Sequence, residues 1–401
     1  MHNMLRVAVI GAGMMGLQHV EAIRRIPGTE VVAVADANGD LARQAGEQLC
    51  IPACYTDYRR MLEEQKPNVV HNCTPNHLHF GINAELLRRG IHVYCEKPLG
   101  LNSEETGKLC KLAEQSSAQA GVNFNYRQNV MAQEMHVRMA DASRWGRTYL
   151  IHSRYLQDWL MYDTDFNWRC RSEYAGKSRA LADIGSHFFD LVQFITGQKI
   201  VRVNATLKTV LPQRLPSPNG QPVDIDTEDE ALVMFELADG VPGSLIVSQV
   251  AAGTKNDLEI TIDGSAYSMS WSQENADKLK ISTRDTPGSL LYTGREMLQG
   301  EARQYATLPS GHPVGWQDGL RNGIQAFYAP IRDHAPVNYA TFEDGDYVVR
   351  VVEACVRSQR GARGTGAGKK WKRAARGIGI RGRAFVLHGV YAWRSTSRAA
   401  P

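Results

Sequence analysis

Paired cysteines are absent from this sequence. It contains seven cysteines in 401 residues, none of them in a CxxC pair, and most lie within hydrophobic stretches. Reduced thiols of intracellular proteins are distributed in this way, whereas small secreted scaffolds concentrate their cysteines in disulfide frameworks. We therefore expect no disulfide framework and a cytoplasmic location.

Long apolar runs are absent as well. The longest one near the amino end, residues 7–17, is interrupted by Gly11, Gly13 and Gly16, and it is shorter than the ~20 residues that a membrane-spanning helix needs. No small-residue cleavage site follows it. We expect neither a membrane anchor nor a secretory leader, and no membrane partner.

Acidic residues are missing from the last 42 positions. Residues 360–401 hold eleven of the 46 basic residues and eight glycines, so residues 1–359 carry 35 basic and 42 acidic side chains. Basic Gly/Arg tracts can bind nucleic acid by attracting phosphates. The tail has little helical or strand periodicity, however, which favours disorder, and we expect no nucleic-acid partner.

The remaining 359 residues are long enough for two hydrophobic cores. Overall, 43% of the chain is hydrophobic and 22% is charged, as in soluble globular proteins. Residues 1–127 alternate short β-branched stretches with longer amphipathic ones, which predicts an α/β Rossmann domain with a doubly wound parallel sheet. The expected strands are residues 6–10, 31–36, 68–74, 92–96 and 120–125.

Residues 128–359 have a different pattern. Short strand-like stretches at 231–237, 244–250, 258–263 and 267–271 are separated by brief turn sequences. Apolar Leu258, Ile260 and Ile262 alternate with polar residues, so one face of that strand is buried and the other is solvated. We predict a second α+β domain with a mostly antiparallel sheet that has one open side.

A glycine-rich turn follows the first expected strand directly. Gly11 permits a tight turn, Gly13 lets the backbone approach a pyrophosphate, and Gly16 lets the next helix pack on the strand. The N–H groups at the helix amino end, at Met14 and Met15, would then bind the phosphates. A tight turn in an unrelated α/β protein is the alternative, but the order strand, glycines, helix favours dinucleotide binding.

A carboxylate ends the second expected strand. Asp36 lies twenty residues after Gly16, where it would accept hydrogen bonds from the adenosine ribose hydroxyls and repel a 2′-phosphate. This spacing predicts NAD as the cofactor. NADP stays open, because Asn38 and Arg43 are nearby.

Three further stretches resemble a known family when they are taken with the glycine turn. They are residues 74–79 (TPNHLH), 96–98 (EKP) and 183–190 (DIGSHFFD). The set resembles the glucose-fructose oxidoreductase, inositol dehydrogenase and rhizopine catabolism family, written Gfo/Idh/MocA, over residues 5–359. The resemblance implies a Rossmann domain, a second domain built on a large open sheet, and hydride transfer between a nicotinamide and a sugar or cyclitol hydroxyl.

The family's lysine, aspartate and histidine fall on Lys97, Asp183 and His187. Oxidation of a secondary alcohol without a metal requires a side-chain base for the hydroxyl proton. His187 is a natural acceptor, and Lys97, at the carboxyl end of a parallel strand, could stabilise the alkoxide or carry the proton itself. Asp183 lies four residues before His187, so on a helix the two would share a face.

Each of these residues also has a purely structural interpretation. Lys97 could be a solvated lysine at a strand end, and His187 a core histidine under its phenylalanine neighbours. Asp190 is expected to be structural. A metal held by Asp183, His187 and Asp190 would need further ligands at suitable spacing, and we predict no metal.

Two loops at the carboxyl ends of expected strands should border the cofactor. One contains TPNHLH, whose histidines would shape the loop, and the other contains EKP. The residues expected there are Thr74, Pro75, Asn76, His79, Glu96 and Lys97.

The second domain offers aromatic residues beside polar ones, which is what a sugar requires, because its CH faces stack and its hydroxyls need donors and acceptors. Core packing is the alternative for each of them. The stretches YLQDWL and GHPVGW resemble family members that oxidise the 3-position of glucosides or anhydrosugars. The candidate substrate residues are Arg127, Tyr155, Asp158, Trp159, Trp168, Asp183, His187 and His312.

We therefore expect an NAD-dependent dehydrogenase that oxidises a secondary hydroxyl of a sugar, glycoside, anhydrosugar or cyclitol, and that forms a homodimer or homotetramer through its open sheet. One alternative is a glycosidase that oxidises C3 only transiently and then returns the hydride. Another is a regulator that binds NAD without chemistry.

Overall fold

The computed structural model describes residues 4–216 and 220–362. The basic tail that we expected from residue 360 onward therefore lies outside the described residues from position 363. Among the helices within these ranges, none is both long and apolar enough to cross a membrane. Residues up to Gln359 group into one unit by their contacts.

The amino-terminal part is a six-stranded sheet whose neighbouring strands all run parallel, in the order β3-β2-β1-β4-β5-β6. The strand order reverses between β1 and β4, and ligands of doubly wound sheets bind beside such a reversal. The doubly wound parallel sheet predicted from the sequence is confirmed. Its elements are β1 (Leu5–Ile10), α1 (Met14–Arg24), β2 (Thr29–Ala35), α2 (Gly39–Gln48), β3 (Cys54–Tyr55), α3 (Tyr58–Gln65), β4 (Val69–Asn72), α4 (Asn76–Arg88), β5 (His92–Cys95), α5 (Ser103–Gln115) and β6 (Ala120–Val122).

The longer strands of this sheet are buried along most of their length. β1 has the sequence LRVAVI, and Val7, Ala8 and Val9 are fully buried. Strands that are covered by helices on both faces require this composition, because neither face meets water. The helices between them begin at side-chain caps where the chain offers them, as at Asn38 and Asn102, whose side chains accept backbone N–H groups of α2 and α5.

The carboxy-terminal part is built on an eight-stranded sheet with the order β16-β15-β14-β13-β7-β12-β11-β8. All its neighbours pair antiparallel except β12 with β7, so the predicted mostly antiparallel sheet is confirmed. The strands are β7 (Thr148–Leu156), β8 (Ile200–Lys208), β11 (Glu230–Leu237), β12 (Pro242–Ser248), β13 (Asp257–Gly264), β14 (Ser268–Ser272), β15 (Lys278–Ser282) and β16 (Ser289–Tyr292), and β9 (Gln213–Arg214) pairs separately with β10 (Val223–Asp224).

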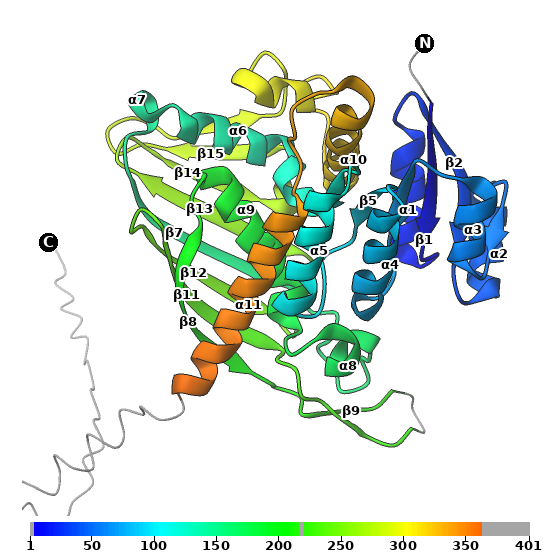
Figure 1. Cartoon of the computed structure of the whole chain (residues 1–401). Helices are drawn as coiled ribbons and strands as arrows, with labels where there is room; N and C mark the ends of the chain where they lie inside the picture. Colours follow the sequence, from blue (N-terminus) through cyan, green and yellow to red (C-terminus); the bar gives the residue numbers. More distant parts are fainter. Residues whose placement is uncertain (1–3, 217–219, 363–401) are drawn as a thin grey trace, which may run out of the picture. The chain divides into compact units, whose positions relative to one another are not determined.

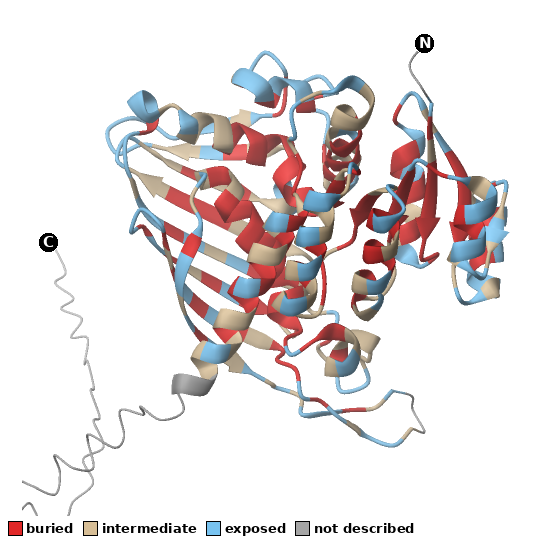
Figure 2. Ribbon diagram, in the orientation of Figure 1, coloured by how far each residue is buried: buried red, intermediate tan, exposed pale blue. Residues whose placement is uncertain are grey.

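Helices cover one face of the large sheet (Figure 1). Along β11 and β12, alternate side chains are buried and exposed, because the opposite face meets solvent. Figure 2 shows the buried residues concentrated between this sheet and its helices. The helical elements after β6 are η1 (Asn125–Gln128), α6 (Val130–Ala140), α7 (Ala142–Trp145), η2 (Trp168–Cys170), α8 (Ser172–Ala175), η3 (Leu181–Gly185), α9 (Ser186–Thr196), η4 (Gln273–Asn275), η5 (Gly300–Tyr305), α10 (Trp316–Asp333) and α11 (Phe342–Ala362).

One helix from the carboxy-terminal part packs on the amino-terminal sheet. Leu320, Ile324 and Phe327 of α10 belong to the same hydrophobic cluster as Val7 and Val9 of β1. We had expected residues 128–359 to form the second domain, but α10 lies against the Rossmann core because its apolar stripe is buried there. The two halves are therefore joined by a helix as well as by the chain crossing after β6.

Candidate active site

A cleft of about 1340 Å³ runs from the carboxyl edge of the parallel sheet to the large sheet. One end is lined by Gly11, Gly13 and Asp36, and the other end by Trp159, Trp168 and Asn256. This position, at the strand-order reversal, is where doubly wound sheets bind ligands.

The glycine turn has the shape that a dinucleotide needs. Gly11 has a φ of +98°, and a Cβ there would lie 2.6 Å from the carbonyl oxygen of Cys73. A Cβ on Gly16 would lie 1.9 Å from the carbonyl oxygen of Gly11, so α1 can approach the turn only without a side chain. At Gly13 a Cβ would meet nothing within 4 Å, and this glycine lines the cleft together with Met14 and Met15. The turn leaves room for phosphates at the amino end of α1.

Asp36 is oriented by the backbone of this turn. Its Oδ2 accepts the N–H of Ala12 at 2.8 Å, and its Oδ1 accepts the N–H of Asn38 at 2.8 Å. Each oxygen keeps a further lone pair, and the residue lines the cleft. Its carboxylate is therefore placed to accept hydrogen bonds from ribose hydroxyls.

The loop after β4 forms the next part of the wall. Thr74, Pro75 and Asn76 line the cleft, and Thr74 donates its hydroxyl to Oδ1 of Asn72 at 2.7 Å. His79 does not belong to the cleft wall. It is fully buried, and its ring nitrogens lie 2.8 Å from the carbonyl oxygens of Pro98 and Thr74. His79 therefore joins the two loops that border the cleft, and any effect on a cofactor would be indirect.

Lys97 and Asp183 meet across the cleft. The Nζ atom of Lys97 donates to Oδ1 of Asp183 at 2.9 Å and to its backbone carbonyl at 3.0 Å. Lys97 follows β5, whereas Asp183 lies in the π-helical turn η3 that leads into α9. The sequence predicted both residues as catalytic, and the fold brings them into direct contact.

The carboxylate of Asp183 has three cationic or amide partners. Besides Lys97, Gln249 donates its amide to Oδ2 at 2.9 Å, and Nε of Arg169 lies 3.5 Å from Oδ1. Burial by itself would raise the pKa of Asp183, but the charges of Lys97 and Arg169 outweigh it and hold the pKa well below its usual range. Asp183 is therefore ionised at neutral pH.

His187 lies one helical turn after Asp183, on the same wall of the cleft. Its ring contacts the ring of Tyr126 at a centroid distance of 4.7 Å and that of Phe124 at 6.0 Å. Neither ring nitrogen has a hydrogen-bond partner among the described residues, and Nδ1 is buried. Burial lowers the pKa of His187 to about 3, with a further contribution from the charge of Lys97. The ring is therefore neutral at neutral pH.

A buried hydrogen-bonded chain supports the EKP loop. Oε1 of Glu96 lies 2.9 Å from Nε2 of His19 and 2.6 Å from the amide of Asn123, while Nδ1 of His19 lies 2.7 Å from Nδ1 of His71. Burial would raise the pKa of Glu96, but His19 and then Lys97 lower it to about 2. Glu96 is thus a carboxylate directly before Lys97. His19 lies in α1 and His71 in β4, 52 residues apart in the sequence. Neither residue could be identified from the sequence, because only the fold brings them together.

The end of the cleft away from the glycine turn contains a group of hydrogen-bonded polar side chains. The hydroxyls of Tyr126 and Tyr155 lie 2.9 Å apart, and Asn256 bonds to both, at 3.0 Å and 2.8 Å. Gln157 donates to Asn256 at 2.9 Å and accepts from Trp159 at 2.9 Å. Tyr155, Trp159 and Trp168 were candidates from sequence and line the cleft. The residues of this part of the cleft that were not among the candidates from sequence are Asn125, Tyr126, Gln157, Arg169 and Asn256, of which Gln157 stands within the YLQDWL stretch.

Three predicted substrate residues lie outside the cleft wall. Arg127 is buried in an ion pair with Asp190, which it contacts through Nε at 2.9 Å, and Asp158 is bound by Lys255 at 2.6 Å. His312 is exposed on a loop, with Nδ1 3.1 Å from the carbonyl oxygen of Pro309. Their side chains are engaged elsewhere or turned to solvent, so we leave these three out of the proposed site. Asp190, which we expected to be structural, is engaged by Arg127.

Two family models match most of the chain outside its tail. The first, "Oxidoreductase family, NAD-binding Rossmann fold", matches residues 5–124, and the second, "GFO/IDH/MocA C-terminal domain", matches residues 136–270. Both belong to the family that the TPNHLH, EKP and DIGSH motifs resemble.

Curated relatives and solved structures agree with these models. Levoglucosan dehydrogenase from Pseudarthrobacter phenanthrenivorans is 29% identical over 88% of this chain and 96% of its own length. Inositol 2-dehydrogenase from an Arthrobacter species is 28% identical over 59% of this chain and 67% of its own. A structure of levoglucosan dehydrogenase with NADH and L-sorbose superimposes with a TM-score of 0.83 at 27% identity, covering 90% of this chain and 97% of that one. An inositol dehydrogenase homologue from Azotobacter vinelandii with NADH and myo-inositol gives 0.79 at 26% identity, covering 89% and 96%. The chain belongs to the Gfo/Idh/MocA family of oxidoreductases with an NAD-binding Rossmann fold.

Proposed function

We propose that this chain oxidises a secondary hydroxyl group of a sugar, glycoside, anhydrosugar or cyclitol and transfers the hydride to NAD. The observation that carries the proposal is the convergence of Lys97, Asp183 and His187 on one cleft whose other end is the glycine turn and Asp36. The relatives named levoglucosan dehydrogenase and inositol 2-dehydrogenase support the substrate class.

The residues that would hold the cofactor fit a dinucleotide. The open face at Gly13 and the uncapped amino end of α1 accommodate phosphates, and the carboxylate of Asp36 suits a ribose without a 2′-phosphate. Bound NAD supplies the hydride acceptor. The preference for NAD over NADP rests on the negative charge of Asp36.

We assign the proton chemistry to His187 and Lys97. As the C–H bond breaks and its electron pair leaves as hydride, the hydroxyl O–H bond also breaks and a C=O bond forms. The neutral ring of His187 has one unprotonated nitrogen, which would accept the proton, while the ammonium of Lys97 would stabilise the charge that develops on oxygen. Asp183 holds Lys97 and is placed to orient the substrate hydroxyl.

The substrate side of the cleft favours a polyhydroxylated ring. Trp159 and Trp168 offer aromatic surface for CH faces, and Gln157 and Asn256 offer amide donors and acceptors. The mixture of stacking surfaces and fixed polar groups suits a carbohydrate or cyclitol better than an apolar alcohol.

The test is a screen of sugars, glycosides, anhydrosugars and inositols with NAD and NADP, followed by the absorbance of reduced cofactor. Steady formation of reduced cofactor with at least one compound is expected. Glycoside cleavage without net reduction would instead favour the transiently oxidising glycosidase. Binding of NAD without turnover of any compound would favour the regulator.

We also propose that two or four copies of this chain associate through the open face of the large sheet. Leu232 and Met234 of β11 are 57% and 61% exposed, and Ile246 of β12, which is paired with Leu232, is 48% exposed. Contiguous apolar side chains on a sheet face favour burial against another surface. An identical copy would present the same apolar strip, as two-fold symmetric interfaces require.

A further inference from the structure

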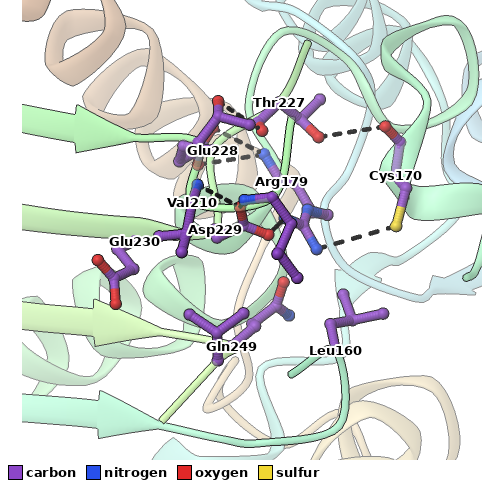
Figure 3. A network of polar contacts seen from close by, with 12 residues as sticks. Leu160, Cys170, Arg179, Val210, Thr227, Glu228, Asp229, Glu230 and Gln249 are labelled. Atoms are coloured by element: carbon purple, nitrogen blue, oxygen red, sulfur yellow. Dashed lines mark hydrogen bonds and ion pairs between the residues drawn. The ribbon is translucent and has the colours of Figure 1, made fainter. Parts of the chain in front are cut away.

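A buried carboxylate in the second domain receives two guanidinium groups. Asp229 lies directly before β11 and is fully buried, and its Oδ1 accepts from both Arg179 and Arg214, the latter at 2.9 Å. Its Oδ2 accepts the backbone N–H groups of Val210 at 2.6 Å and Leu211 at 3.0 Å. Figure 3 shows Asp229 at the centre of this network, with Arg179 on one side. Both arginines are also fully buried.

The other Nη donors of Arg214 bond to one loop, whereas its buried Nε has no partner among the described residues. Its Nη2 donates to the carbonyl oxygen of Leu160 at 2.8 Å, and its Nη1 donates to those of Tyr162 and Asp165, each at 2.8 Å. These three carbonyls belong to residues 160–165. That loop connects Trp159 to Trp168, and both of these tryptophans line the substrate side of the cleft. Arg214 therefore fixes the course of the backbone between two cleft residues.

Arg179 acts on the other wall. It lies four residues before Asp183, and its carbonyl oxygen accepts the N–H of Asp183 at 2.7 Å. Its backbone N–H is received by the buried carboxylate of Glu228 at 3.1 Å, and its Nη1 lies 3.9 Å from Sγ of Cys170. The backbone of Arg179 thus holds the segment from which the η3 turn, and with it Asp183, begins, and its side chain ties this segment to Asp229 and Cys170.

Gln249 closes the connection between the two walls. Its backbone N–H donates to the carbonyl oxygen of Asp229 at 3.0 Å, its own carbonyl accepts from Leu160 at 3.2 Å, and its side chain reaches Asp183 at 2.9 Å. Gln249 therefore contacts the two walls through separate groups: its backbone bonds to Asp229 and to the loop of residues 160–165, and its side chain bonds to Asp183.

We propose that Arg214 and Arg179 are positioning residues that share Asp229 but set different walls of the site. Arg214 holds the loop of residues 160–165 and so governs sugar binding. Arg179 holds the segment that leads into η3 and Asp183, and so governs the chemical step. The inference rests on the proposed function. Neither arginine lines the cleft.

Lysine is an informative replacement at both positions. An ammonium keeps the positive charge beside Asp229, so no buried carboxylate is left without a cation. It cannot reproduce the planar fork, and at position 214 it cannot reach three carbonyls at once. Small displacements of residues that orient a substrate have large kinetic effects.

The kinetic test compares R214K and R179K, with R202K as the control, because Arg202 forms an exposed ion pair with Glu236 on the large sheet. We expect R214K to raise KM for the sugar about tenfold with kcat within about twofold, and R179K to lower kcat about tenfold with little change in KM. NADH affinity should be unchanged in all three. If R214K and R179K changed the same kinetic parameter by the same factor, and both had the same lower Tm, the proposed division of roles would be wrong.

Two further measurements keep the inference testable by other means. If a lysine variant does not fold, D229N provides a second test, because it weakens the contacts of Asp229 with both Arg179 and Arg214. D229N should then show both the raised KM and the lowered kcat. Normal kinetics in D229N would overturn the proposal. If the wild-type protein oxidises no sugar, the proposed function fails, but hydrogen exchange still tests the network. Exchange should quicken in residues 157–169 of R214K and in residues 181–187 of R179K. Identical exchange patterns in R214K and R179K would contradict the proposed division of roles.

Discussion

The ammonium nitrogen of Lys97 lies 2.9 Å from Oδ1 of Asp183. Lys97 follows a strand of the parallel sheet, and Asp183 belongs to the helical turn beneath the large sheet. The pair is largely buried, with 13% and 15% of the two side chains exposed, so its attraction is weakly screened by solvent. The contact links the wall of the cleft that follows the parallel sheet to the wall formed by η3 and α9.

Replacement of Lys97 by methionine should abolish most turnover without preventing cofactor binding. Methionine keeps the length of the side chain but removes the ammonium, so charge developing on the substrate oxygen loses its nearest cation. We expect kcat to fall about 10²–10⁴-fold, the range of a positioned catalytic group. NADH affinity, measured by fluorescence, should change less than about threefold, since Asp36 and the glycine turn are untouched. An inactive variant that also fails to bind NADH would assign Lys97 to the cofactor site instead.

His187→Ala tests the proton acceptor. Removal of the imidazole should lower kcat/KM by about 10²–10⁴-fold, because the other histidine of the described cleft wall, His77, lies in the first turn of α4 with its ring against Tyr174 and not beside Asp183. The control is His136→Ala, a half-buried histidine outside the cleft wall that bonds to the carbonyl oxygen of Phe194, two helical turns after His187 in α9. Full activity of His187→Ala would leave Lys97 as the proton carrier.

The low pKa of His187 also predicts how stability depends on pH. The pKa is about 3 in the folded chain and ~6.5 in an unfolded one, so between these values only the unfolded state binds the proton. The free energy of unfolding should therefore decrease as pH falls from 6.5, by up to ~1.4 kcal/mol per pH unit from this residue.

Urea unfolding of the wild type and of His187→Asn at pH 7 and pH 5 measures this contribution. The wild type should lose more stability than the variant over this interval, and the buried His71 contributes equally to both. Exposed His312→Asn should behave as the wild type does. Parallel losses in wild type and His187→Asn would mean that His187 is not held neutral by burial.

Asp36→Asn should weaken the preference for NAD. Asparagine still accepts the N–H of Ala12 but loses the negative charge and one acceptor oxygen, which are the groups suited to ribose hydroxyls. We expect kcat/KM for NAD to fall about tenfold or more, while that for NADP stays the same or rises. Asp40→Asn, on the exposed side of α2, is the matched control. An unchanged ratio between the two cofactors would remove Asp36 from cofactor selection.

Charged substitutions on the open sheet face should separate the subunits. The double substitution Leu232→Asp and Met234→Glu puts two carboxylates where the proposed interface is apolar, and buried unpaired charges are costly. Light scattering should give a dimer or tetramer for the wild type and a monomer for the variant. Met297→Glu, an equally exposed methionine away from the sheet, should not change the mass. A monomeric wild type would contradict the interface.

The elements of the parallel sheet could be predicted because their signals are local. The apolar runs around Val7 and Val31 and the glycine turn between them depend only on neighbours in sequence. The antiparallel strand with Leu258, Ile260 and Ile262 was predictable for the same reason, through its strict alternation. β7 and β8 were not identified, because their exposed apolar residues, such as Tyr149 and Val201, obscure that alternation.

The site was predictable where a motif marks it and not where distant residues meet. Lys97, Asp183 and His187 follow from EKP and DIGSH, and the fold brings them together. Asn256 and Gln157 reach the cleft only because β13 pairs with β7. No pattern in the sequence predicts that pairing. Arg127 and His312 were misplaced for the converse reason, since polar residues near aromatic ones can equally serve an internal ion pair or a solvent-exposed loop.

The fate of the substrate hydrogen tests the central claim most directly. A sugar or cyclitol that is turned over should be supplied with deuterium at its carbon-bound positions, and the reduced cofactor should be isolated and weighed by mass spectrometry. Direct hydride transfer predicts a reduced cofactor one mass unit heavier, formed in equal amount to the ketone. Reduced cofactor without the label, or a ketone formed without reduced cofactor, would contradict it.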